Sequence, residues 1–163
     1  MTTPTHLTAL IGRDSELAEI AHLLGMPECR LITLTGSGGI GKTRLALEAI
    51  HQNALPDGAY FVPLQSYSSA DAIVPAIADE LKFVFFGEHD ARTQLLYYLR
   101  EKQLLLVLDN FEHLLDGADF LPEILDAAPG IKILVTSRER LNLLEEWVLD
   151  IRGLRFPEQE PNQ

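Results

Sequence analysis

The sequence predicts an α/β fold, a three-layer sandwich built on a central, mainly parallel five-stranded sheet. Short apolar, β-branched segments alternate with helical patterns of roughly 10–15 residues, which is typical of a parallel sheet with helices on both faces. One such segment, residues 103–108, contains the unbroken run Leu-Leu-Leu-Val-Leu and suits a central strand buried on both sides. The length of 163 residues fits one domain of this kind.

The expected strands are the apolar segments of this pattern, residues 29–35, 59–64, 103–108, 131–136 and 147–151. Helical periodicity predicts helices over residues 14–24, 42–55, 71–81, 90–102 and 116–128. Asp71 and Asp90 suit the N-cap positions of their helices, and Asp14 or Ser15 can cap the first helix. Ligands of such folds bind at the carboxyl ends of the strands, so the candidate site is sought there.

The chain is strongly acidic, with 24 acidic against 13 basic residues and a net charge of −11. A field of this sign repels a phosphate backbone unless basic residues gather on one face, and the sequence contains no such cluster. We therefore expect no nucleic-acid binding by this domain, although a further domain in a longer protein could supply it.

Neither a membrane helix nor a secretory signal is expected. The longest unbroken apolar stretch, residues 104–108, is far shorter than the roughly 20 residues that cross a bilayer. The first six residues lack the basic and apolar regions of a secretory signal. The single cysteine, Cys29, fits a buried apolar position and has no partner for an internal disulfide. These features predict a cytoplasmic protein.

A glycine-rich segment follows the first expected strand and opens the next helix. Residues 36–43 read Gly-Ser-Gly-Gly-Ile-Gly-Lys-Thr and match G-x-x-x-x-G-K-[ST] at every fixed position. Consecutive backbone N–H groups must point at phosphate oxygens in such a loop, and glycine reaches the required dihedral angles without a Cβ clash. The helix N-terminus adds a partial positive charge. The segment therefore predicts a phosphate-binding loop and a P-loop NTPase fold.

Two side chains are expected to hold Mg²⁺ beside the phosphates. The first is the Thr43 hydroxyl, an uncharged oxygen ligand for the metal. Beside it, Lys42 supplies a cation for the β- and γ-phosphates. Asp109 ends the expected central strand, where a carboxylate would make the second metal contact. A strand-terminal Asp can also be a turn residue, but the phosphate loop favours the metal contact.

Three further residues near this edge bear on ATP hydrolysis. Asn110 follows the strand-terminal aspartate, and an amide there cannot accept a proton from an attacking water. Glu112 is the nearest replacement, and it is either a catalytic base or a solvated loop acid. Arg138 follows the next strand, where its guanidinium could sense a γ-phosphate through charge-assisted hydrogen bonds. The alternative for Arg138 is a surface arginine paired with Glu139 or Glu112.

Four segments, the phosphate loop among them, resemble those of STAND ATPases, the NB-ARC-like signal-transduction switches, and occur in that family's order. Residues 11–17, Ile-Gly-Arg-Asp-Ser-Glu-Leu, resemble the hhGRE element that precedes the phosphate loop. Residues 106–114, Leu-Val-Leu-Asp-Asn-Phe-Glu-His-Leu, are similar to the Walker B segment of bacterial members. Residues 136–139, Thr-Ser-Arg-Glu, resemble the sensor segment. The chain is therefore identified as a nucleotide-binding domain of this family.

The resemblance implies roles that spacing alone does not give. The hhGRE element of the family packs against adenine, so Ile11 and Arg13 would contact the base or ribose, and Arg138 would read the γ-phosphate. Members usually rest with ADP bound, exchange it for ATP on receiving a signal, and then oligomerise. The implied nucleotide contacts are Ile11, Gly12, Arg13, Gly36, Gly38, Gly39, Ile40, Gly41, Lys42, Thr43 and Arg44. The candidate catalytic residues are Lys42, Asp109, Glu112 and Arg138, and the metal ligands are Thr43 and Asp109.

The family's remaining nucleotide contacts come from helical and winged-helix domains, which would follow residue 154 and are not in this sequence. The nucleotide-binding domain is expected over residues 1–155, with the hhGRE segment and first helix in residues 1–28. Residues 156–163 are expected to be a polar tail or truncated linker. The expected partners are the nucleotide, the missing C-terminal helical, winged-helix and sensor domains, and a nucleotide-dependent homo-oligomer.

The sequence thus predicts an ATP/ADP-binding, Mg²⁺-dependent switch domain with weak or absent hydrolysis, because Asn110 stands where many members have an acid. One alternative is a P-loop small-molecule kinase, which needs an arginine-bearing lid; residues 129–147 are few and hold only Arg138 and Arg140. The other is an ATP-driven nucleic-acid-processing ATPase, whose basic channel the acidic composition disfavours.

Overall fold

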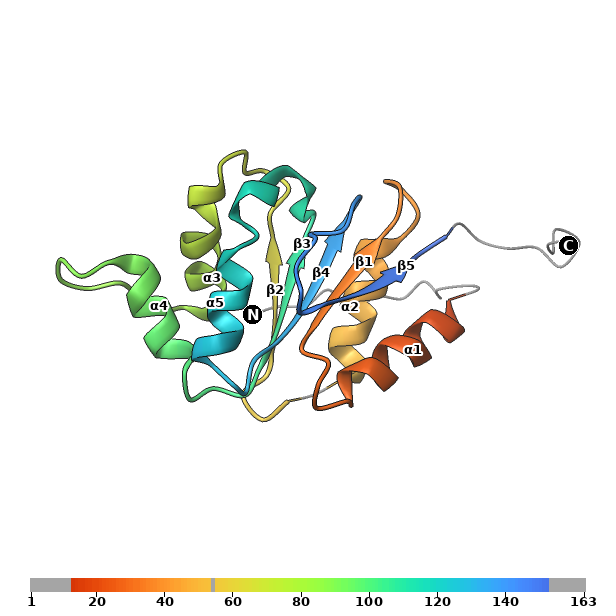
Figure 1. Ribbon diagram of the computed structural model, residues 1–163, viewed down its shortest axis with the longest axis horizontal. Coiled ribbons are helices and arrows are strands. Elements are labelled where there is room, and N and C mark those ends of the chain that lie inside the picture. The colour runs from red at the N-terminus through yellow and green to blue at the C-terminus, as the bar shows by residue number, and fades with distance from the viewer. Residues whose placement is uncertain (1–12, 54, 153–163) are drawn as a thin grey trace, which may run out of the picture.

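The computed structural model describes residues 13–53 and 55–152. In this part of the chain, five strands form one sheet in the order β2-β3-β4-β1-β5, and every neighbouring pair is parallel (Figure 1). The predicted α/β fold with a five-stranded sheet is confirmed. The strands are β1 (Leu31–Thr35), β2 (Ala59–Pro63), β3 (Leu105–Asp109), β4 (Lys132–Ser137) and β5 (Glu146–Asp150).

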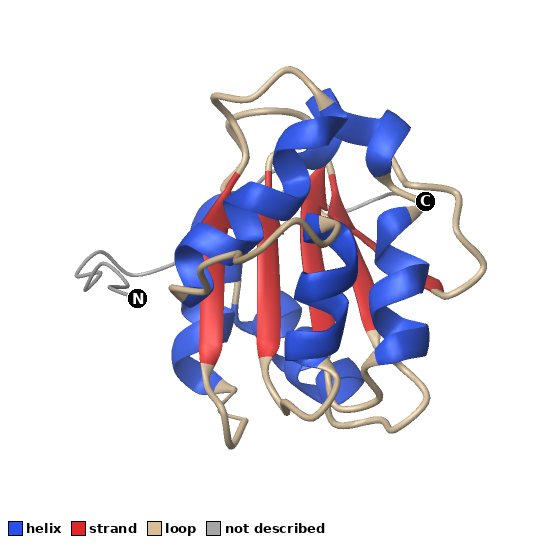
Figure 2. Cartoon of the chain, turned by 90° about the vertical axis from the view of Figure 1, so that its left-hand side faces the viewer, coloured by secondary structure: helices blue, strands red, loops and turns tan. Residues whose placement is uncertain are grey.

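Helices cover both faces of the sheet and complete the three layers. On one face lie α1 (Asp14–Leu24) and α2 (Lys42–Gln52), and on the other α3 (Ile73–Leu81), α4 (Ala91–Leu99) and α5 (Phe120–Ala127). Figure 2 views the sheet from the second face, with its helices in front of the strands. Alternate residues of β1 enter the two cores: Leu31 packs with the second set of helices, and Ile32 and Leu34 with the first.

The N-caps of the helices differ in part from the prediction. Asp90 caps α4 as expected, because its carboxylate accepts the Thr93 backbone N–H at 3.0 Å. The prediction for Asp71 is wrong: a 3-10 turn, Ala70–Ala72, precedes α3, and the side chain of Ser69 caps it by accepting the Asp71 N–H. The N-cap position of α1 is Arg13, without a side-chain cap, so the expectation for Asp14 or Ser15 is also wrong.

The predicted helix over residues 116–128 begins too early, and the one over 42–55 ends too late, since α2 stops at Gln52. Phe111–Gly117 forms 3-10 turns, and α5 starts only at Phe120. The cause is tertiary packing. Phe111 is buried, and Gly117 passes so close to Ile73 that a Cβ would lie 2.6 Å from its Cδ1.

Two basic residues at the amino edge of the sheet fasten the ends of helices. Arg30 donates to the carbonyls of Leu125 at 3.0 Å and Ala128 at 2.6 Å, at the end of α5. Lys132 donates to carbonyls at the end of α1, including that of Met26 at 3.0 Å. Cations at the C-termini of helices satisfy carbonyls that lack helical partners and complement the helix dipole. These two charges therefore serve the fold.

Cys29 lies just before β1, which begins two residues later than predicted. The thiol is buried, and burial raises its pKa to about 11. A thiol with so high a pKa is a poor nucleophile at neutral pH. Cys29 therefore acts as the small buried residue that the sequence predicts.

Candidate nucleotide-binding site

The predicted phosphate loop connects β1 to α2 at the carboxyl edge of the sheet. Gly39 and Gly41 have φ angles of 82° and 96°, and Gly41 is the N-cap of α2. A Cβ at either position would meet nothing within 4 Å, so the left-handed backbone, and not crowding, requires glycine here. The structure thus places an open glycine turn at a helix N-terminus, as phosphate binding requires.

Neighbouring groups approach Gly36 and Gly38 closely. A Cβ at Gly36 would lie 2.6 Å from the carbonyl oxygen of Ile151, which directly follows β5. A Cβ at Gly38 would lie 2.7 Å from Nη2 of Arg138. The end of β5 and the predicted sensor arginine therefore both rest on the phosphate loop.

Lys42 is folded back onto the loop that precedes it. Its Nζ donates to the carbonyls of Gly36 at 2.6 Å and Ser37 at 3.0 Å, and the residue is buried. Burial lowers the pKa of the ammonium group, while the charge of Glu112 raises it. The cation is thus held at the loop, beside the turn that would receive phosphate.

Asp109, the last residue of β3, lies beside the start of α2. The Thr43 hydroxyl donates to its Oδ1 at 2.9 Å and Oδ2 at 3.1 Å, and the Thr136 hydroxyl donates to Oδ1 at 2.8 Å. Burial raises the pKa of the carboxyl, and the two hydroxyl donors lower it. The structure therefore brings together the two predicted metal ligands as a compact set of hard oxygen donors.

Glu112 and Arg138 meet beside the loop. A Glu112 carboxylate oxygen accepts the backbone N–H of Arg138 at 3.2 Å, and the Glu112 side chain is only 15% exposed, so it is not a freely solvated acid. Within residues 13–53 and 55–152, no carboxylate lies within 4.0 Å of the Arg138 guanidinium. The guanidinium is therefore not tied up in the surface pair with Glu139 or Glu112 that the sequence left open.

These groups surround a cavity of about 500 Å³. Eight predicted site residues line it: Gly38, Gly39, Gly41, Lys42, Thr43, Arg44, Glu112 and Arg138. Asp109 contacts one of them, Thr43, from behind. His113, the neighbour of Glu112 in the sequence, also lines the cavity. A volume of this size falls in the range of small-molecule sites.

Sequence reasoning missed Gln65 and Thr136. Gln65 lines the cavity and accepts the Asn110 side-chain N–H at 3.1 Å. Thr136 accepts the Asn110 backbone N–H at 2.8 Å while donating to Asp109. Both are polar residues at the carboxyl ends of strands, at the edge where Asp109 was found. That position was the signal available in the sequence.

Arg13 has partners other than those the resemblance implies. The buried guanidinium donates to the carbonyl oxygens of Ile40, in the phosphate loop, and of Arg152 at 2.7 Å, just after β5. It also lies 3.4 Å from Glu16. Arg13 therefore joins the start of α1, the phosphate loop and the end of β5. The adenine contact stays a prediction, and Ile11 and Gly12 lie outside the described residues.

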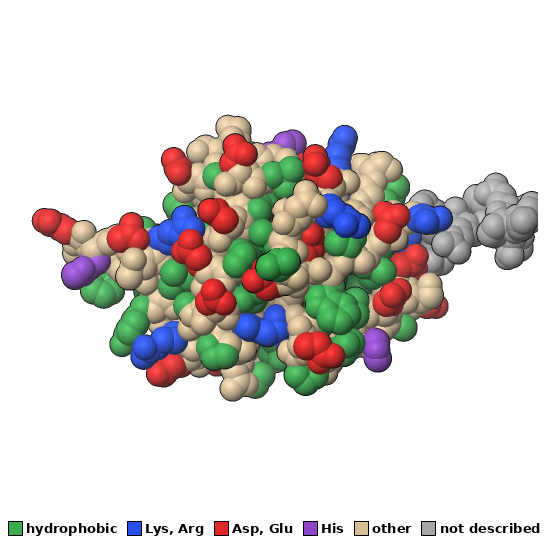
Figure 3. Space-filling model, in the orientation of Figure 1, with side chains coloured by type: hydrophobic (Ala, Val, Ile, Leu, Met, Phe, Trp, Pro, Cys, Tyr) green, Lys and Arg blue, Asp and Glu red, His purple; other side chains and the backbone are tan. Residues whose placement is uncertain are grey.

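The surface charge in Figure 3 is mixed: on that face, Lys and Arg side chains are spread singly among Asp and Glu. The whole chain carries a net charge of −11.

Among the described residues, none of the helices combines the length and the apolar character needed to cross a membrane. The cytoplasmic location stays a prediction.

A loop between β1 and α2 that holds a buried lysine, with an aspartate two strands away contacting the first threonine of the helix, is the arrangement of P-loop domains. Residues 26–144 match the AAA domain family. The chain belongs to this family. Such a domain is a P-loop NTPase, as the loop sequence predicts.

Two longer proteins illustrate the sequence relationship. A Mycobacterium tuberculosis protein named as an HTH-type transcriptional regulator is 36% identical over 118 residues, which are 72% of this chain and 13% of that protein. TMV resistance protein N of Nicotiana glutinosa is 28% identical over 175 aligned residues, 98% of this chain and 15% of that protein. The chain thus spans a small part of the length of these relatives.

Solved structures share the fold. Cdc6p from Pyrobaculum aerophilum superposes with a TM-score of 0.62 at 22% identity, over 85% of this chain and 41% of that one. A STAND protein with a tetratricopeptide repeat sensor from Pyrococcus horikoshii gives 0.62 at 19% identity, over 94% of this chain and 25% of that one. Together with the family match and the resistance protein, the second structure confirms the predicted resemblance to STAND-class P-loop ATPases.

Proposed function

We propose that this domain binds ATP and ADP with Mg²⁺ and acts as the nucleotide-dependent switch of a longer signal-transduction ATPase, with slow hydrolysis. The observation that carries the proposal is the contact of Thr43 with Asp109 beside the open glycine turn. This contact joins the glycine loop to two hard oxygen groups, the Thr43 hydroxyl in the cavity wall and the Asp109 carboxylate behind it.

The residues fit a magnesium nucleotide. The turn at Gly39 and Gly41 leaves space where a Cβ would stand, and the N-terminus of α2 favours an anion there. The Lys42 ammonium would neutralise the β- and γ-phosphates. The Thr43 hydroxyl and Asp109 carboxylate would hold Mg²⁺, which when bound neutralises phosphate charge in the transition state.

Binding would exchange contacts that the chain makes with itself. Lys42 would leave the carbonyls of Gly36 and Ser37 for phosphate oxygens, which are stronger acceptors. The Thr43 hydroxyl now donates its hydrogen to Asp109, and it would instead turn its oxygen toward the cation. Asp109 would keep its bond from Thr136, which holds the carboxylate in place.

Slow hydrolysis follows from the groups beside the metal ligands. Asn110 offers an amide whose N–H is already donated to Gln65, and an amide is no general base. Glu112 is the carboxylate nearest to that role, but one oxygen accepts the Arg138 backbone N–H. Since Asn110 has no carboxylate and Glu112 already accepts this N–H, we expect the site to hold ATP longer than it cleaves it.

The switch would depend on Arg138. Its guanidinium lies against Gly38 of the glycine loop, and the resemblance to STAND ATPases implies that it would contact the γ-phosphate, which ADP lacks. A ligand shifts a conformational equilibrium only through such differential contacts. In the longer protein, the difference between ATP and ADP would be read at this residue.

The test is to measure Mg·ATP and Mg·ADP binding by calorimetry and phosphate release by a coupled assay. The proposal expects binding of both nucleotides, with phosphate release far slower than the 1–100 s⁻¹ or so of typical kinases. Failure to bind either nucleotide would contradict it. Phosphate transfer that requires an added small-molecule acceptor would instead favour the kinase alternative, and a salt-dependent shift with single-stranded DNA the nucleic-acid motor.

A further inference from the structure

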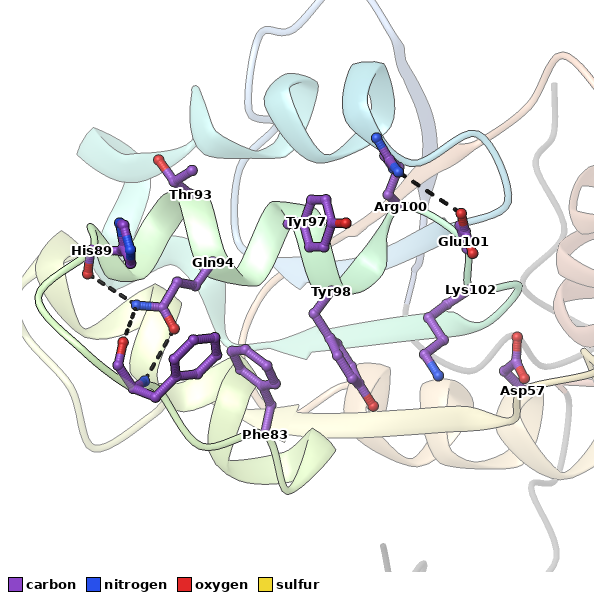
Figure 4. Close-up of a pocket in the computed structure, with 11 residues that line it drawn as sticks. Asp57, Phe83, His89, Thr93, Gln94, Tyr97, Tyr98, Arg100, Glu101 and Lys102 are labelled. Carbon is purple, nitrogen blue, oxygen red and sulfur yellow. Dashed lines mark hydrogen bonds and ion pairs between the residues drawn. The ribbon is translucent and has the colours of Figure 1, made fainter.

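Arg13 is a deeply buried cation beside the glycine loop. Figure 4 shows the contrasting case of two surface cations, Arg100 and Lys102, at one end of a groove of about 680 Å³ along α4. The Arg100 side chain is 53% exposed, and Lys102 lies shortly before β3, at the amino edge of the sheet. The Arg13 side chain is only 6% exposed. Burial of a guanidinium is costly unless its donors are bonded, so its partners indicate its role.

The partners of Arg13 include backbone carbonyls from two separate parts of the chain. Its Nη2 donates to the carbonyl of Ile40 in the glycine loop, and its Nη1 to that of Arg152, just after β5, at 2.7 Å. Nη1 also lies 3.4 Å from a carboxylate oxygen of Glu16. Because the guanidinium is a rigid planar fork, it holds the glycine loop and the end of β5 in a fixed relation.

The end of β5 is the fixed side of this connection. The Ile151 N–H donates to the Thr35 carbonyl at 2.7 Å, and the Thr35 hydroxyl donates to Asp150 at 3.1 Å. Along its whole length, β5 is paired with β1. The bond from Arg13 therefore ties the Ile40 carbonyl to a rigid part of the sheet.

This bond also fixes the direction of the peptide group between Ile40 and Gly41. In a trans peptide the C=O and the N–H point in opposite directions. The Ile40 carbonyl faces Arg13, so the Gly41 N–H faces the other side. Gly41 lines the candidate nucleotide cavity, and within residues 13–53 and 55–152 its N–H has no backbone acceptor. The N–H is thus available to a ligand.

The loop needs such a support because its backbone is rich in glycine. Gly39 and Gly41, on either side of Ile40, have φ angles of 82° and 96°, and glycine loses more conformational freedom on ordering than any other residue. Lys42 bonds only to carbonyls in the first half of the loop, and it would give these bonds up to phosphate. The bond from Arg13 lies on the outer side of the peptide group and would persist when phosphate binds.

We propose that Arg13 is a positioning residue of the phosphate site: by holding the Ile40 carbonyl outward, it aims the Gly41 N–H at a bound phosphate. The inference rests on the proposed nucleotide binding and deepens it. It differs from the base contact that the family resemblance implies. A residue that shapes the loop affects every ligand with two linked phosphates, whether or not that ligand carries a base.

The test compares inorganic pyrophosphate, which has no base, with ADP, each with Mg²⁺, by titration calorimetry on the full chain. Arg13→Ala should weaken both ligands to the same degree, by about tenfold, since one hydrogen bond to a charged ligand is misdirected. Wild-type affinity for pyrophosphate in Arg13→Ala, with or without a loss for ADP, would overturn the proposal. A wild-type chain that binds neither ligand would contradict the proposed function, and the positioning role with it.

Arg30→Ala is the matched control for lost stability and lost charge. The Arg30 guanidinium also donates to backbone carbonyls, but at the amino edge of the sheet. Its removal should lower the melting temperature, as Arg13→Ala does, yet leave pyrophosphate binding unchanged when both variants are measured well below their melts. Equal losses of affinity in the two variants would reduce the effect of Arg13 to stability and charge, and would overturn the proposal.

The direction of the peptide group can be followed through the amide NMR signal of Gly41. In the wild type, its proton signal should move downfield as pyrophosphate is added, because the N–H bonds to a charged oxygen. Arg13→Ala should reduce this movement at saturating pyrophosphate, and an unchanged movement would contradict the positioning role. Arg13→Lys keeps the charge but not the fork, so it should recover only part of the affinity. Full recovery would show that charge alone suffices.

Discussion

The hydroxyl of Thr43 donates to both carboxylate oxygens of Asp109, although 66 positions separate the two residues in the sequence. The parallel sheet makes this contact possible, because β3 ends and α2 begins at the same edge, the carboxyl edge of the sheet. Thr136 of β4, the strand between β1 and β3, supports the carboxylate from the other side. The glycine loop and the predicted metal-binding carboxylate are thereby assembled from three segments.

The role of Thr136 can be tested by removing only its hydroxyl. Thr136→Val should leave the fold intact and lower the affinity for Mg²⁺ in the presence of ADP by about 10–100-fold, since it releases the carboxylate of Asp109. The matched control is Thr33→Val in β1. The Thr33 hydroxyl is buried and has no hydrogen-bond partner among the described residues, so that variant should bind normally and melt no earlier than wild type. Equal effects of both changes on affinity would contradict the support role.

The buried carboxyl of Asp109 should make the stability of the ligand-free protein depend on pH. Its folded pKa is raised, mainly by burial, so the ionised form carries a cost that grows as pH rises through the folded pKa and disappears below the unfolded value near 4. In EDTA, Asp109→Asn should therefore unfold at higher denaturant concentration than wild type at pH 7. The gap should shrink as the pH falls toward 4. A gap that widens in acid would show the opposite sign for the shift.

Removing the Arg13 side chain should mainly reduce the stability of the fold. Arg13→Ala removes charged donors from the carbonyls of Ile40 and Arg152, and should lower the free energy of unfolding by about 2–4 kcal/mol without nucleotide. Arg152→Ala is the matched control, because only the backbone carbonyl of Arg152 takes part in the bond to Arg13. It should be nearly silent in denaturant melts. Arg13→Ala could instead leave stability unchanged and weaken only the binding of adenine nucleotides. That result would support the base contact implied by the family resemblance and contradict a structural role for the bonds to Ile40 and Arg152.

The sensor role of Arg138 separates ATP from ADP. Arg138→Ala should weaken Mg·ATP binding about tenfold, or about 1.4 kcal/mol, and leave Mg·ADP within about twofold. Arg140→Ala, an exposed arginine two residues away, should change neither. Calorimetry with both nucleotides decides this, and equal losses for ATP and ADP would count against a γ-phosphate sensor.

The local parts of this architecture could be predicted from the sequence. The phosphate loop is contiguous, and its glycines, lysine and threonine are fixed by the backbone and charge requirements of one ligand. Asp109 could be placed because a buried apolar strand has a definite carboxyl end. The strands of the sheet were predictable for the same reason, within two residues at their ends.

Contacts between distant segments could not be predicted. Arg13 bonds to backbone carbonyls, which any residue provides, so no side-chain pattern marks Ile40 or Arg152 as its partners. The late start of α5 follows from the close packing of Gly117 against Ile73. Only the folded chain defines this contact. Gln65 was overlooked although it follows a strand at the correct edge, because a lone amide matches no motif.

The most direct test of the central claim, that residues 36–43 and Asp109 form one Mg·nucleotide site, is titration calorimetry of ADP with and without Mg²⁺ on three variants. Lys42→Ala should lose binding under both conditions, since its cation neutralises phosphate. Asp109→Ala should lose the gain that Mg²⁺ gives, and Lys102→Ala, at the opposite edge of the sheet, should match wild type. Wild-type affinity and Mg²⁺ dependence in both Lys42→Ala and Asp109→Ala would contradict the site.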